Sequence, residues 1–370
     1  MNFATIAGIA LLALVLRDAF ETIILPRRVR RIFQLTSIFY RVSWKVWRAA
    51  ATQFKGKYRE NSLSWYGPFS LLMLLVVWAL TIVFAFGLLH YGAGSALKMD
   101  GGTPGFLDDL YLSGTTFFTL GMGDVVPRVA TAKFITVFEA GLGFAFLAII
   151  IGYLPVIYQA FSRREIAISL LDARAGSPPS AGELLWRNQG DQNREDLVRL
   201  LAEWERWSAE VLESHLSYPV LAYFRSQHGN QSWLAALTTI LDTSALVMVG
   251  FDGWCMRQAH LTFAMARHAV VDLAQVFSVA PPEGPVDRLP DEQFDRLIAR
   301  LRDAGLKFEE GGVRERLNDT RAMYEPYVAA LSAHLALPIP EWNRTKERPD
   351  NWEGAPWKLA RKGKAAPEHF

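Results

Sequence analysis

Residues 69–89 constrain the fold of this chain more than any other segment, because FSLLMLLVVWALTIVFAFGLL contains no charged side chain. A helix rises about 1.5 Å per residue, so this segment is long enough to cross the roughly 30 Å hydrocarbon layer of a bilayer. Residues 134–161 are similarly apolar except for Glu139, which a bilayer tolerates only where the carboxylate faces protein or water. Both segments predict membrane-spanning helices.

A third candidate span lies at the start of the chain, in residues 1–25. Arg17, Asp18 and Glu21 interrupt this apolar run near one end. In a cleaved signal peptide the basic residues precede the apolar core, whereas here the basic run follows it. We therefore predict an N-terminal transmembrane helix in which Arg17 and Glu21 pair one helical turn apart.

The charges divide the chain into a membrane part and a water-soluble part. Residues 1–160 carry 14 Lys or Arg and 8 Asp or Glu, whereas residues 161–370 carry 25 and 29. The hydrophobic content of 51% is high for a wholly soluble protein, and the excess lies in the first part. The single cysteine, Cys255, excludes an internal disulfide and a thiolate metal site, so we expect it to be a small buried hydrophobe.

The segment 26–64 is strongly basic and sets the predicted orientation. Residues 27–60 hold ten Lys or Arg and one acid, whereas residues 91–105 hold only Lys98 and Asp100. By the positive-inside rule, segment 26–64 lies on the cytoplasmic side of a plasma membrane, so the N-terminus is outside the cell and the C-terminal half is cytoplasmic. We expect a basic helix on the inner surface, with the lipid bilayer and not nucleic acid as its partner. Its apolar and aromatic residues at helical spacing are Ile32, Phe33, Phe39, Tyr40, Trp44 and Trp47.

Residues 105–119 predict a short helix that enters the membrane and returns. FLDDLYLSGTTFFT follows a glycine-rich loop and places Asp108 and Asp109 in the first turn, where acids complement the positive helix end. A helix of about 13 residues spans only about 20 Å, which is too short to cross. A non-helical return segment at membrane depth survives only where it lines water or is buried in protein.

The return segment TLGMGD has the composition of a carbonyl ladder for cations. Gly121 and Gly123 alternate with Leu120 and Met122, and glycine allows positive φ at every second residue, so that successive carbonyls can point to one side. Four such strands around an axis would replace the hydration shell of an ion. The negative C-terminal end of the short helix favours a cation at the same place.

TTFFTLGMGDVVP resembles the pore signature of tetrameric potassium channels, and the order span, re-entrant helix, filter, span resembles that family's pore module. The resemblance covers residues 69–161. It implies that the carbonyls of Thr119, Leu120, Gly121 and Met122, with the Thr119 hydroxyl, are potassium ligands. It implies that Gly123 and Asp124 complete the selectivity filter, with Asp124 behind the outer mouth. Because the chain holds one filter, we expect a homotetramer.

Three positions depart from the pattern of that family. Met122 stands where Tyr or Phe is usual, Leu120 where Val or Ile is usual, and Phe118 where Thr is usual. Side chains in this strand point away from the ion, so the carbonyl ladder survives these changes. The aromatic and hydroxyl anchor behind the filter is lost, and methionine fixes its surroundings poorly. We therefore expect a potassium-selective channel, with a non-selective cation channel as the alternative.

Four residues of the second pore span are candidates for gating. Gly141 and Gly143 each lower helix stability by about 1 kcal/mol relative to Ala, and they serve either a bend or close packing. Pro155 removes one backbone hydrogen bond and could splay the inner mouth. Glu139 either attracts cations into the cavity or is tied to hydroxyls and amides behind the pore helix, and we favour the second role.

The letters GxGD also resemble a signature of intramembrane aspartyl proteases, in which two aspartates from neighbouring spans form a pair. The other aspartates inside long apolar runs are Asp18 and Asp242, and neither follows a tyrosine as in that family. The protease motif also lies inside a continuous span. We therefore predict that the protein is not an enzyme.

The C-terminal half predicts a cytoplasmic all-α bundle. A linker over 162–193 contains SPPSAG and NQGDQN, the helical domain covers 194–337, and a loosely ordered tail covers 338–370. Residues 233–251 are nearly long enough to span a membrane, but Asp242 at the centre favours a buried central helix. The expected helices cover residues 194–215, 231–250, 255–279, 291–305 and 313–336.

No cofactor is indicated by this domain. It lacks a phosphate-binding glycine loop, a dinucleotide fingerprint and His or Cys residues at metal-ligand spacing. Its scattered histidines are expected to be ordinary core or surface residues: His215, His228, His260, His268 and His334. The ligand of the domain, if it regulates the pore, is not indicated, and permeant potassium is the one ion that we expect.

Overall fold

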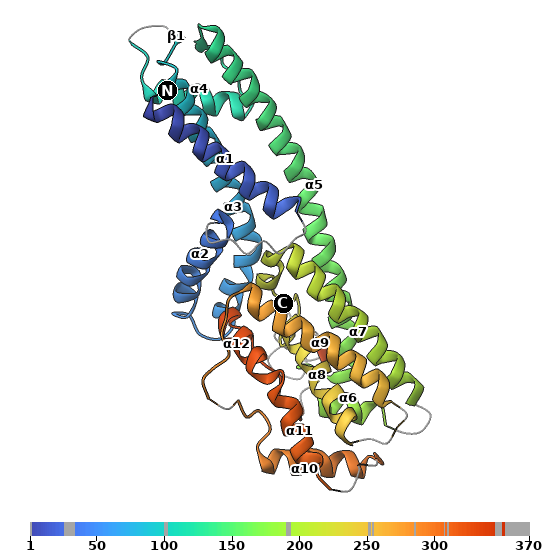
Figure 1. The fold of residues 1–370 in the computed structure, drawn as a ribbon. Coiled ribbons are helices and arrows are strands. Elements are labelled where there is room, and N and C mark those ends of the chain that lie inside the picture. Colours follow the sequence, from blue (N-terminus) through green and yellow to red (C-terminus); the bar gives the residue numbers. More distant parts are fainter. Residues whose placement is uncertain are drawn as a thin grey trace, which may run out of the picture. The chain divides into compact units, whose positions relative to one another are not determined.

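The computed structural model describes residues 2–25, 34–99, 103–189, 194–250, 253, 255–284, 286–306, 308, 311–344 and 350–351. Contacts divide the chain into two compact units, Met1–Gln159 and Ala160–Phe370, which are considered separately below. Within the described residues the secondary structure is almost wholly helical, with one two-stranded sheet (Figure 1). The predicted all-α membrane architecture is confirmed.

The first unit contains the predicted spans as helices α1 (Phe3–Ile23), α3 (Lys57–Gly92) and α5 (Ala130–Ala175). Each is long and apolar enough to cross a membrane. A pore module was expected over residues 65–161. Helix α3 begins eight residues before this range, and α5 continues past its end into the second unit. Hydropathy marks the part of a helix that suits lipid, whereas backbone hydrogen bonding continues through the polar residues on either side.

Helix α1 packs along α3, and glycines allow the close approach. A Cβ added to Gly8 would lie 2.9 Å from the Ala85 carbonyl oxygen, and one added to Gly92 would lie 2.9 Å from the Thr5 amide nitrogen. Small residues at such crossings are typical of helix packing in membranes. The predicted pair on α1 is present, with Arg17 Nε donating to Glu21 Oε1 at 2.9 Å.

Asp18 is a buried carboxylate that joins three helices of this unit. It accepts hydrogen bonds from Trp78 Nε1 on α3 at 2.9 Å and from the Thr36 backbone N–H at 3.1 Å. The Thr36 hydroxyl also donates to it at 2.6 Å. Because Thr36 lies in the first turn of α2 (Leu35–Ala51), Asp18 satisfies a free backbone donor at that helix start.

Within the basic segment 26–64, expected to form one interfacial helix, α2 ends at Ala51 and residues 57–64 form the start of α3. The aromatic residues of α2 face protein rather than lipid. Trp44 is buried against Tyr66 of α3, with ring centroids 4.7 Å apart, and Trp47 Nε1 donates to the Ser62 carbonyl at 2.9 Å. The exposed apolar stripe of α2 is aliphatic and comprises Ile38, Val42 and Val46. Ile32, Phe33 and the arginines at 27–31 lie outside the described residues.

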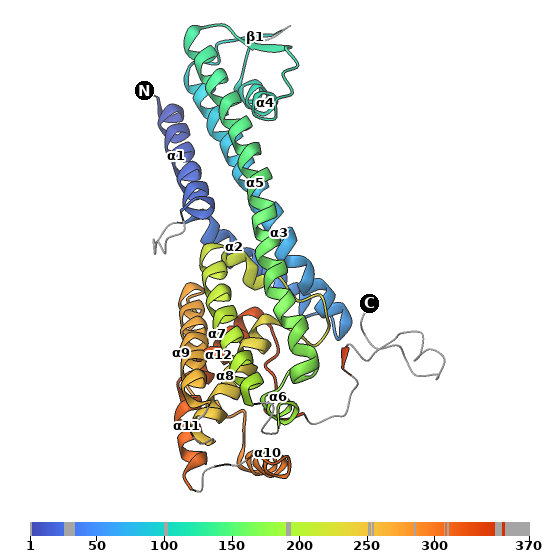
Figure 2. The same ribbon diagram turned by 90° about the vertical axis from the view of Figure 1, so that its right-hand side faces the viewer.

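A short antiparallel sheet joins two loops at one end of the first unit (Figures 1 and 2). Strands β1 (Leu97–Met99) and β2 (Val125–Pro127) pair with Lys98 opposite Val126. The Arg128 N–H extends the contact by donating to the Ala96 carbonyl at 2.8 Å. Three-residue strands are too short to give an alternating pattern, so this sheet was not predicted.

The second unit is a helical bundle with α8 at its centre. Helix α8 (Trp233–Gly250) is buried along nearly its whole length and contacts α6, α7, α9, α11 and α12. The predicted buried central helix is confirmed. The remaining helices are α6 (Ala181–Arg187), α7 (Arg194–Ser217), a 3₁₀ turn (Pro219–Tyr223), α9 (Met256–Val276), α10 (Asp291–Asp303), α11 (Val313–Ala322) and α12 (Glu325–Leu335).

Three expectations for this unit need correction. The linker expected over 162–193 contains the end of α5 and all of α6, whose start is capped by the Glu183 N–H donating to Ser180 Oγ at 3.3 Å. The helix expected over 313–336 is two helices, because Pro326 favours a new helix start. The tail expected to be loose from 338 buries Trp342, although residues 345–349 and 352–370 lie outside the described part.

The buried charges of the second unit are paired within the chain. Arg288 donates to both oxygens of Asp242, at 2.6 and 3.1 Å, and the Tyr324 hydroxyl donates to Asp242 Oδ1 at 2.6 Å. The Arg288 guanidinium also lies over the Trp342 ring, 5.7 Å from its centroid. Such a planar, two-point contact is the geometry in which a buried ion pair offsets its desolvation cost.

Candidate ion-conduction site

The predicted short helix is present as α4 (Phe106–Phe117), and polar contacts hold its start and its middle. The Gly105 N–H donates to Asp108 Oδ2 at 2.9 Å, which caps the helix start as its first-turn position predicts. Asp109 differs from the expectation, because it is buried and accepts a hydrogen bond from the Ser95 hydroxyl. Midway along α4, Ser113 Oγ lies 2.7 Å from the Val83 carbonyl of α3.

The chain leaves α4 through a tight turn and then runs uncoiled through residues 120–123. The N–H groups of Leu120 and Gly121 both point to the Thr115 carbonyl, at 2.7 and 3.2 Å. This shared acceptor ends the helix and leaves the following amides and carbonyls outside any helical ladder. The predicted non-helical return segment is confirmed.

Backbone dihedral angles alternate in sign along the return segment. Thr119, Gly121 and Gly123 have positive φ of 58°, 54° and 81°. Positive φ was predicted at the two glycines, but not at Thr119, where a β-branched residue adopts a conformation that is uncommon for its type. Alternation of left-handed residues with ordinary ones is the pattern that allows successive carbonyls to face one side.

Side chains of the return segment are uncovered in the single chain. Phe118, Leu120 and Met122 are 60%, 64% and 64% exposed. A Cβ added to Gly121 or Gly123 would meet no atom within 4 Å, so these glycines are required for their φ values and not for close packing. The segment is shaped by its own backbone, and the described part of the chain leaves its apolar side chains without cover.

A tyrosine of α4 forms a hydrogen bond with the last residue of the TLGMGD segment. The Tyr111 hydroxyl on α4 donates to Asp124 Oδ2 at 3.0 Å, immediately before β2 begins. Met122 stands where the related channels have an aromatic anchor, and the contact of Tyr111 with Asp124 was not predicted from the sequence. The signal that was available is weak, because it consists only of a tyrosine 13 residues before Asp124 on the polar side of a short helix.

Glu139 lies behind the pore helix, as we favoured over a position in the cavity. It is fully buried on α5, and its Oε1 contacts the Ser113 hydroxyl of α4. Its Oε2 lies 3.7 Å from Nε2 of His90, a residue at the end of α3 that the sequence analysis did not consider. A histidine at the end of an apolar span was the signal that could have identified it.

The two glycines of α5 differ in their surroundings. A Cβ on Gly143 would overlap the Phe117 carbonyl oxygen and lie 3.1 Å from its carbonyl carbon, whereas a Cβ on Gly141 would meet nothing within 4 Å. Gly143 therefore serves the close-packing use that was left open. Helix α5 is continuous through both glycines and through Pro155.

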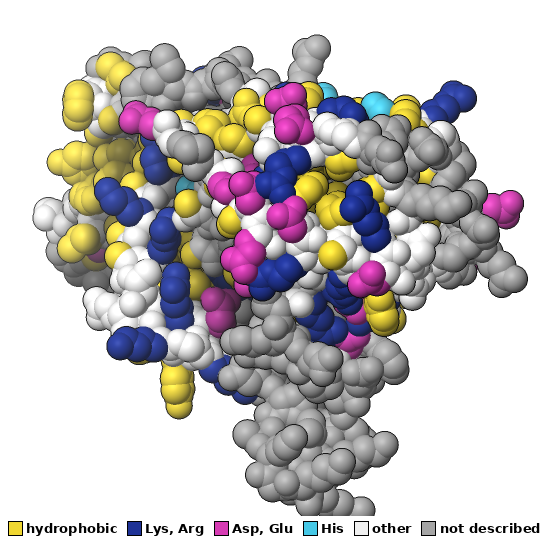
Figure 3. Space-filling view, turned by 90° about the horizontal axis from the view of Figure 1, so that it is seen from below, with side chains coloured by type: hydrophobic (Ala, Val, Ile, Leu, Met, Phe, Trp, Pro, Cys, Tyr) yellow, Lys and Arg dark blue, Asp and Glu magenta, His cyan; other side chains and the backbone are white. Residues whose placement is uncertain are grey.

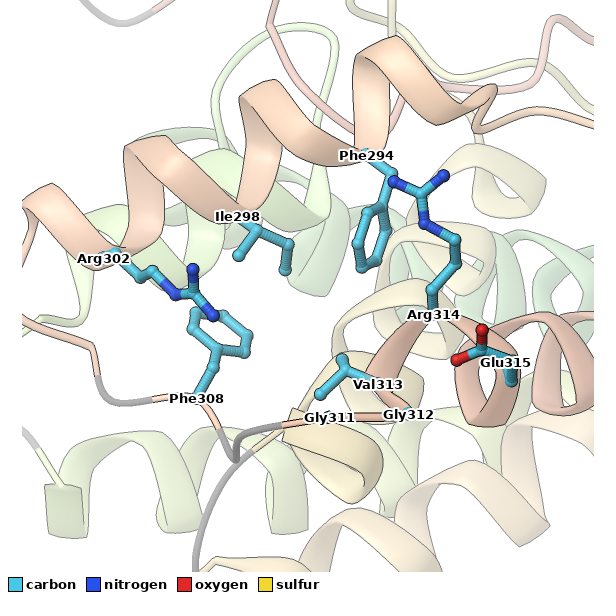
Figure 4. Close-up of a pocket in the computed structure, with 9 residues that line it drawn as sticks. All are labelled: Phe294, Ile298, Arg302, Phe308, Gly311, Gly312, Val313, Arg314 and Glu315. Carbon is cyan, nitrogen blue, oxygen red and sulfur yellow. The ribbon is translucent and has the colours of Figure 1, made fainter.

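The second unit contains a small cavity of about 170 Å³ between α10 and α11. In Figure 4 the side chains of Phe294, Ile298 and Val313 point into it, and the Arg314 guanidinium lies beside the Phe294 ring, 4.7 Å from its centroid. Arg314 is already paired with Asp291 and Asp295.

Elsewhere, the face seen in Figure 3 mixes acidic and basic side chains, which is unlike the single-sign surface of a polyanion site.

The histidines and the cysteine of the second unit have structural surroundings. His215 is fully buried. Its Nε2 accepts a hydrogen bond from Arg164 Nη1 at 3.3 Å, and its Nδ1 donates to the Val211 carbonyl at 2.8 Å. Burial, with the Arg164 charge beside it, lowers the pKa of His215 to about 3. Cys255 is buried as predicted, and burial raises its pKa to about 11. Among the described residues no group of three His, Cys, Asp or Glu side chains is placed to hold a metal.

The three aspartates considered for an intramembrane protease each accept hydrogen bonds from groups other than a second carboxylate. Asp124 accepts from Tyr111, Asp18 from Trp78 and Thr36, and Asp242 from Arg288 and Tyr324. A catalytic pair of carboxylates would instead share a proton between two acids. The described hydrogen bonds therefore give these aspartates anchoring contacts.

Residues 71–159 match the family model described as "Ion channel". The matched segment contains most of α3, all of α4, the return segment and the first part of α5. This segment of the chain is therefore similar to an ion-channel family, which points to a role in ion transport. The geometry of the return segment lies at the centre of this match.

A curated relative extends the similarity beyond the pore segment. The chain is 23% identical over 246 residues to the "Uncharacterized membrane protein YdjJ" of Bacillus subtilis (strain 168), covering 64% of this chain and 71% of the relative. No solved structure matches the chain. The ion-channel match, this relative and the apolar helices together identify a multi-pass membrane protein.

Proposed function

We propose that this protein is a potassium-selective cation channel in which four copies of the TLGMGD segment form the selectivity filter. The supporting observation is the alternation of positive φ at Thr119, Gly121 and Gly123, at the end of a re-entrant helix. Repeated by fourfold symmetry, this backbone would direct the carbonyls of residues 119–122 and the Thr119 hydroxyl to a cation as substitutes for water. The exposed Leu120 and Met122 would be covered by neighbouring copies.

Asp124 and the pore helix would complete the electrostatics of this filter. Held by Tyr111, Asp124 lies beside the exit of the return segment, where a carboxylate raises the local cation concentration. The C-terminal end of α4 carries the partial negative charge of a helix dipole toward the same segment. Both features favour a cation over an anion.

Gating would use the inner helix α5 and the cytoplasmic unit. Gly141 has open space around it and Pro155 interrupts the hydrogen-bond ladder, so these are the positions at which α5 can bend, whereas Gly143 and Glu139 hold the pore helix. In the proposed orientation the N-terminus is outside a plasma membrane and the helical bundle is cytoplasmic. An unidentified cytoplasmic ligand would act on that bundle.

A non-selective cation channel is the second candidate, and the observation that favours it is the exposed, flexible Met122. Selectivity depends on the number and rigidity of the coordinating carbonyls. One anchor, from Tyr111 to Asp124, is described behind the segment, and methionine at 122 adds no polar contact among the described residues. A softer filter would pass sodium nearly as well as potassium.

Flux measured on purified protein in liposomes, with potassium, rubidium and sodium compared, tests the proposal. Potassium and rubidium flux well above sodium flux supports selectivity, and nearly equal fluxes support the second candidate. Native mass spectrometry should give four copies. A monomer or dimer, or a parent protein without flux at any voltage or pH, would contradict the proposal.

A further inference from the structure

A buried cluster of ionisable and hydroxyl side chains lies behind the pore helix, away from the return segment. It brings together His90 of α3, Asp109 and Ser113 of α4, Glu139 of α5 and Ser95 of the loop before β1. His90 is 1% exposed and Asp109, Ser113 and Glu139 are 0% exposed. Burial disfavours the charged forms of these three titratable groups, so their protonation states depend on the side chains around them.

Hydrogen-bond donors limit the protonation state of Glu139. Ser113 Oγ is within hydrogen-bond distance of two oxygens, the Val83 carbonyl at 2.7 Å and Glu139 Oε1. A serine hydroxyl has one proton, and a carbonyl can only accept. Both contacts are hydrogen bonds only if Glu139 carries a proton and donates it to Ser113 Oγ, while Ser113 donates to Val83.

His90 is the second position available to that proton. Its Nε2 lies 3.7 Å from Glu139 Oε2, and neither ring nitrogen has a hydrogen-bond partner among the described residues. If the proton moves from Glu139 to His90, Ser113 must turn its own proton to the carboxylate. The hydrogen bond from Ser113 to the Val83 carbonyl, which ties α4 to α3, is then lost.

Asp109 gives the cluster an excess of acid. One of its oxygens accepts from the Ser95 hydroxyl, the other has no hydrogen-bond partner among the described residues, and the Ser95 N–H donates to the His90 carbonyl at 3.2 Å. With all three groups ionised, two carboxylates would face one imidazolium. A buried net charge is unfavourable, so the cluster favours binding of a further proton.

Among the described residues around His90, Asp108 adds its charge to this cluster through the neighbouring Asp109. Helix α4 also carries Asp108, which is bonded to the Gly105 N–H, and α5 contributes Glu139. Helix α1 meets this end of α3 with Thr5, which does not titrate. The balance of protons is therefore set among His90, Asp109 and Glu139.

We propose that His90, Glu139 and Asp109 form a proton-binding site whose occupancy controls how firmly α4 is held, so that ion flux depends on pH. The proposal rests on the proposed channel function. When Glu139 is protonated, Ser113 bridges it to the Val83 carbonyl and fixes the helix that ends at the filter. When the proton leaves, this bridge is broken and the filter loses support from behind.

Flux through the full chain in liposomes, measured at fixed potassium between about pH 5 and pH 8, tests this. Wild-type flux should follow a single-proton titration. Glu139→Gln keeps an N–H donor for Ser113, so flux should persist and its pH dependence should be lost. His90→Gln should shift or remove the titration. Glu210→Gln, which removes an exposed carboxylate of α7, should leave the wild-type profile.

An infrared titration of the carboxyl groups keeps the two proposals distinguishable. The wild-type protein should show the carbonyl stretch of a buried protonated carboxylic acid, and Glu139→Gln should remove it. A Glu139→Gln variant that conducts with the wild-type pH profile, or the absence of that band, would overturn the proton site. A parent without flux would contradict the channel, while the infrared band would still report on the proton site.

Discussion

The return segment of the first unit and the central helix of the second unit differ in whether a single chain supplies the contacts of their side chains. Around Asp242 the buried groups find their partners within one chain, since Arg288 and Tyr324 satisfy that carboxylate. Along residues 119–123 the backbone conformation is well defined, yet Leu120 and Met122 lie exposed. The buried groups of one region find their partners within a single chain, whereas the other region keeps its apolar side chains exposed, and the proposed channel would cover them with further copies.

Gly123→Ala should have the largest effect on function and none on the second unit. Its φ of 81° is strained for any residue with a Cβ, so the return segment must change conformation. We expect loss of flux in liposomes with an unchanged unfolding profile of α8 by hydrogen exchange. Gly152→Ala is the matched control, because open space surrounds that position of α5. Wild-type flux in Gly123→Ala would contradict a backbone-defined filter.

Asp242→Ala should have the opposite pattern. It leaves the buried Arg288 without its main partner, which costs on the order of 3–5 kcal/mol. Hydrogen exchange of α8 amides in the full chain should report this loss, whereas Asp196→Ala, at an exposed pair with Arg199, should change little. Unchanged protection of α8 would show that the pair is not needed for the stability of this unit.

Acid should weaken the second unit through His215. The imidazole has its pKa lowered to about 3 by burial, from an ordinary value near 6.5. A depressed folded-state pKa gives stability that is full above about pH 6.5 and falls as the pH drops toward the folded value, by up to a few kcal/mol. Urea unfolding followed between these pH values should show the decline. His215→Phe should flatten the dependence, and a variant with the wild-type slope would contradict this assignment.

Gly143→Ala should disturb the pore helix more gently than the change at Gly123. The added methyl group would meet the Phe117 backbone, which cannot rotate away, and overpacking of this kind costs about 1–3 kcal/mol. We expect reduced flux with some conduction retained, measured beside Gly152→Ala, where open space surrounds the added methyl group. Equal flux in the two variants would mean that Gly143 does not hold α4.

Tyr111→Phe should have the smallest effect. It removes one exposed hydrogen bond to Asp124. Because Asp124 would then be free to move beside the mouth, the ratio of sodium to potassium flux should rise while total flux persists. An unchanged ratio would show that another contact supports the filter.

The pore module could be predicted from the sequence because each of its features has a local cause. The uncharged run at 69–89, the short segment before the filter, and the glycines at 121 and 123 each restrict the backbone without reference to distant residues. Positive φ at both glycines and the burial of Glu139 behind α4 followed from such arguments. The ligand roles of residues 119–122 stay predictions.

The remaining features depend on contacts that spacing does not reveal. The contact of Tyr111 with Asp124 and the approach of His90 to Glu139 are set by how α3, α4 and α5 pack. Positive φ at Thr119 follows from the turn that ends α4 and runs against the preference of threonine. Helix α6 had a readable signal, the capping sequence Ser180 to Glu183, which the surrounding prolines and glycines obscured.

The most direct test of the account is a structure of the full chain in lipid nanodiscs, determined by electron microscopy in potassium. The account predicts four copies around one axis, with ion density between the carbonyls of residues 119–122 and with Leu120 and Met122 covered by neighbouring copies. Copies whose residues 119–123 do not meet at a common axis, or that wind this segment into a helix, would contradict it.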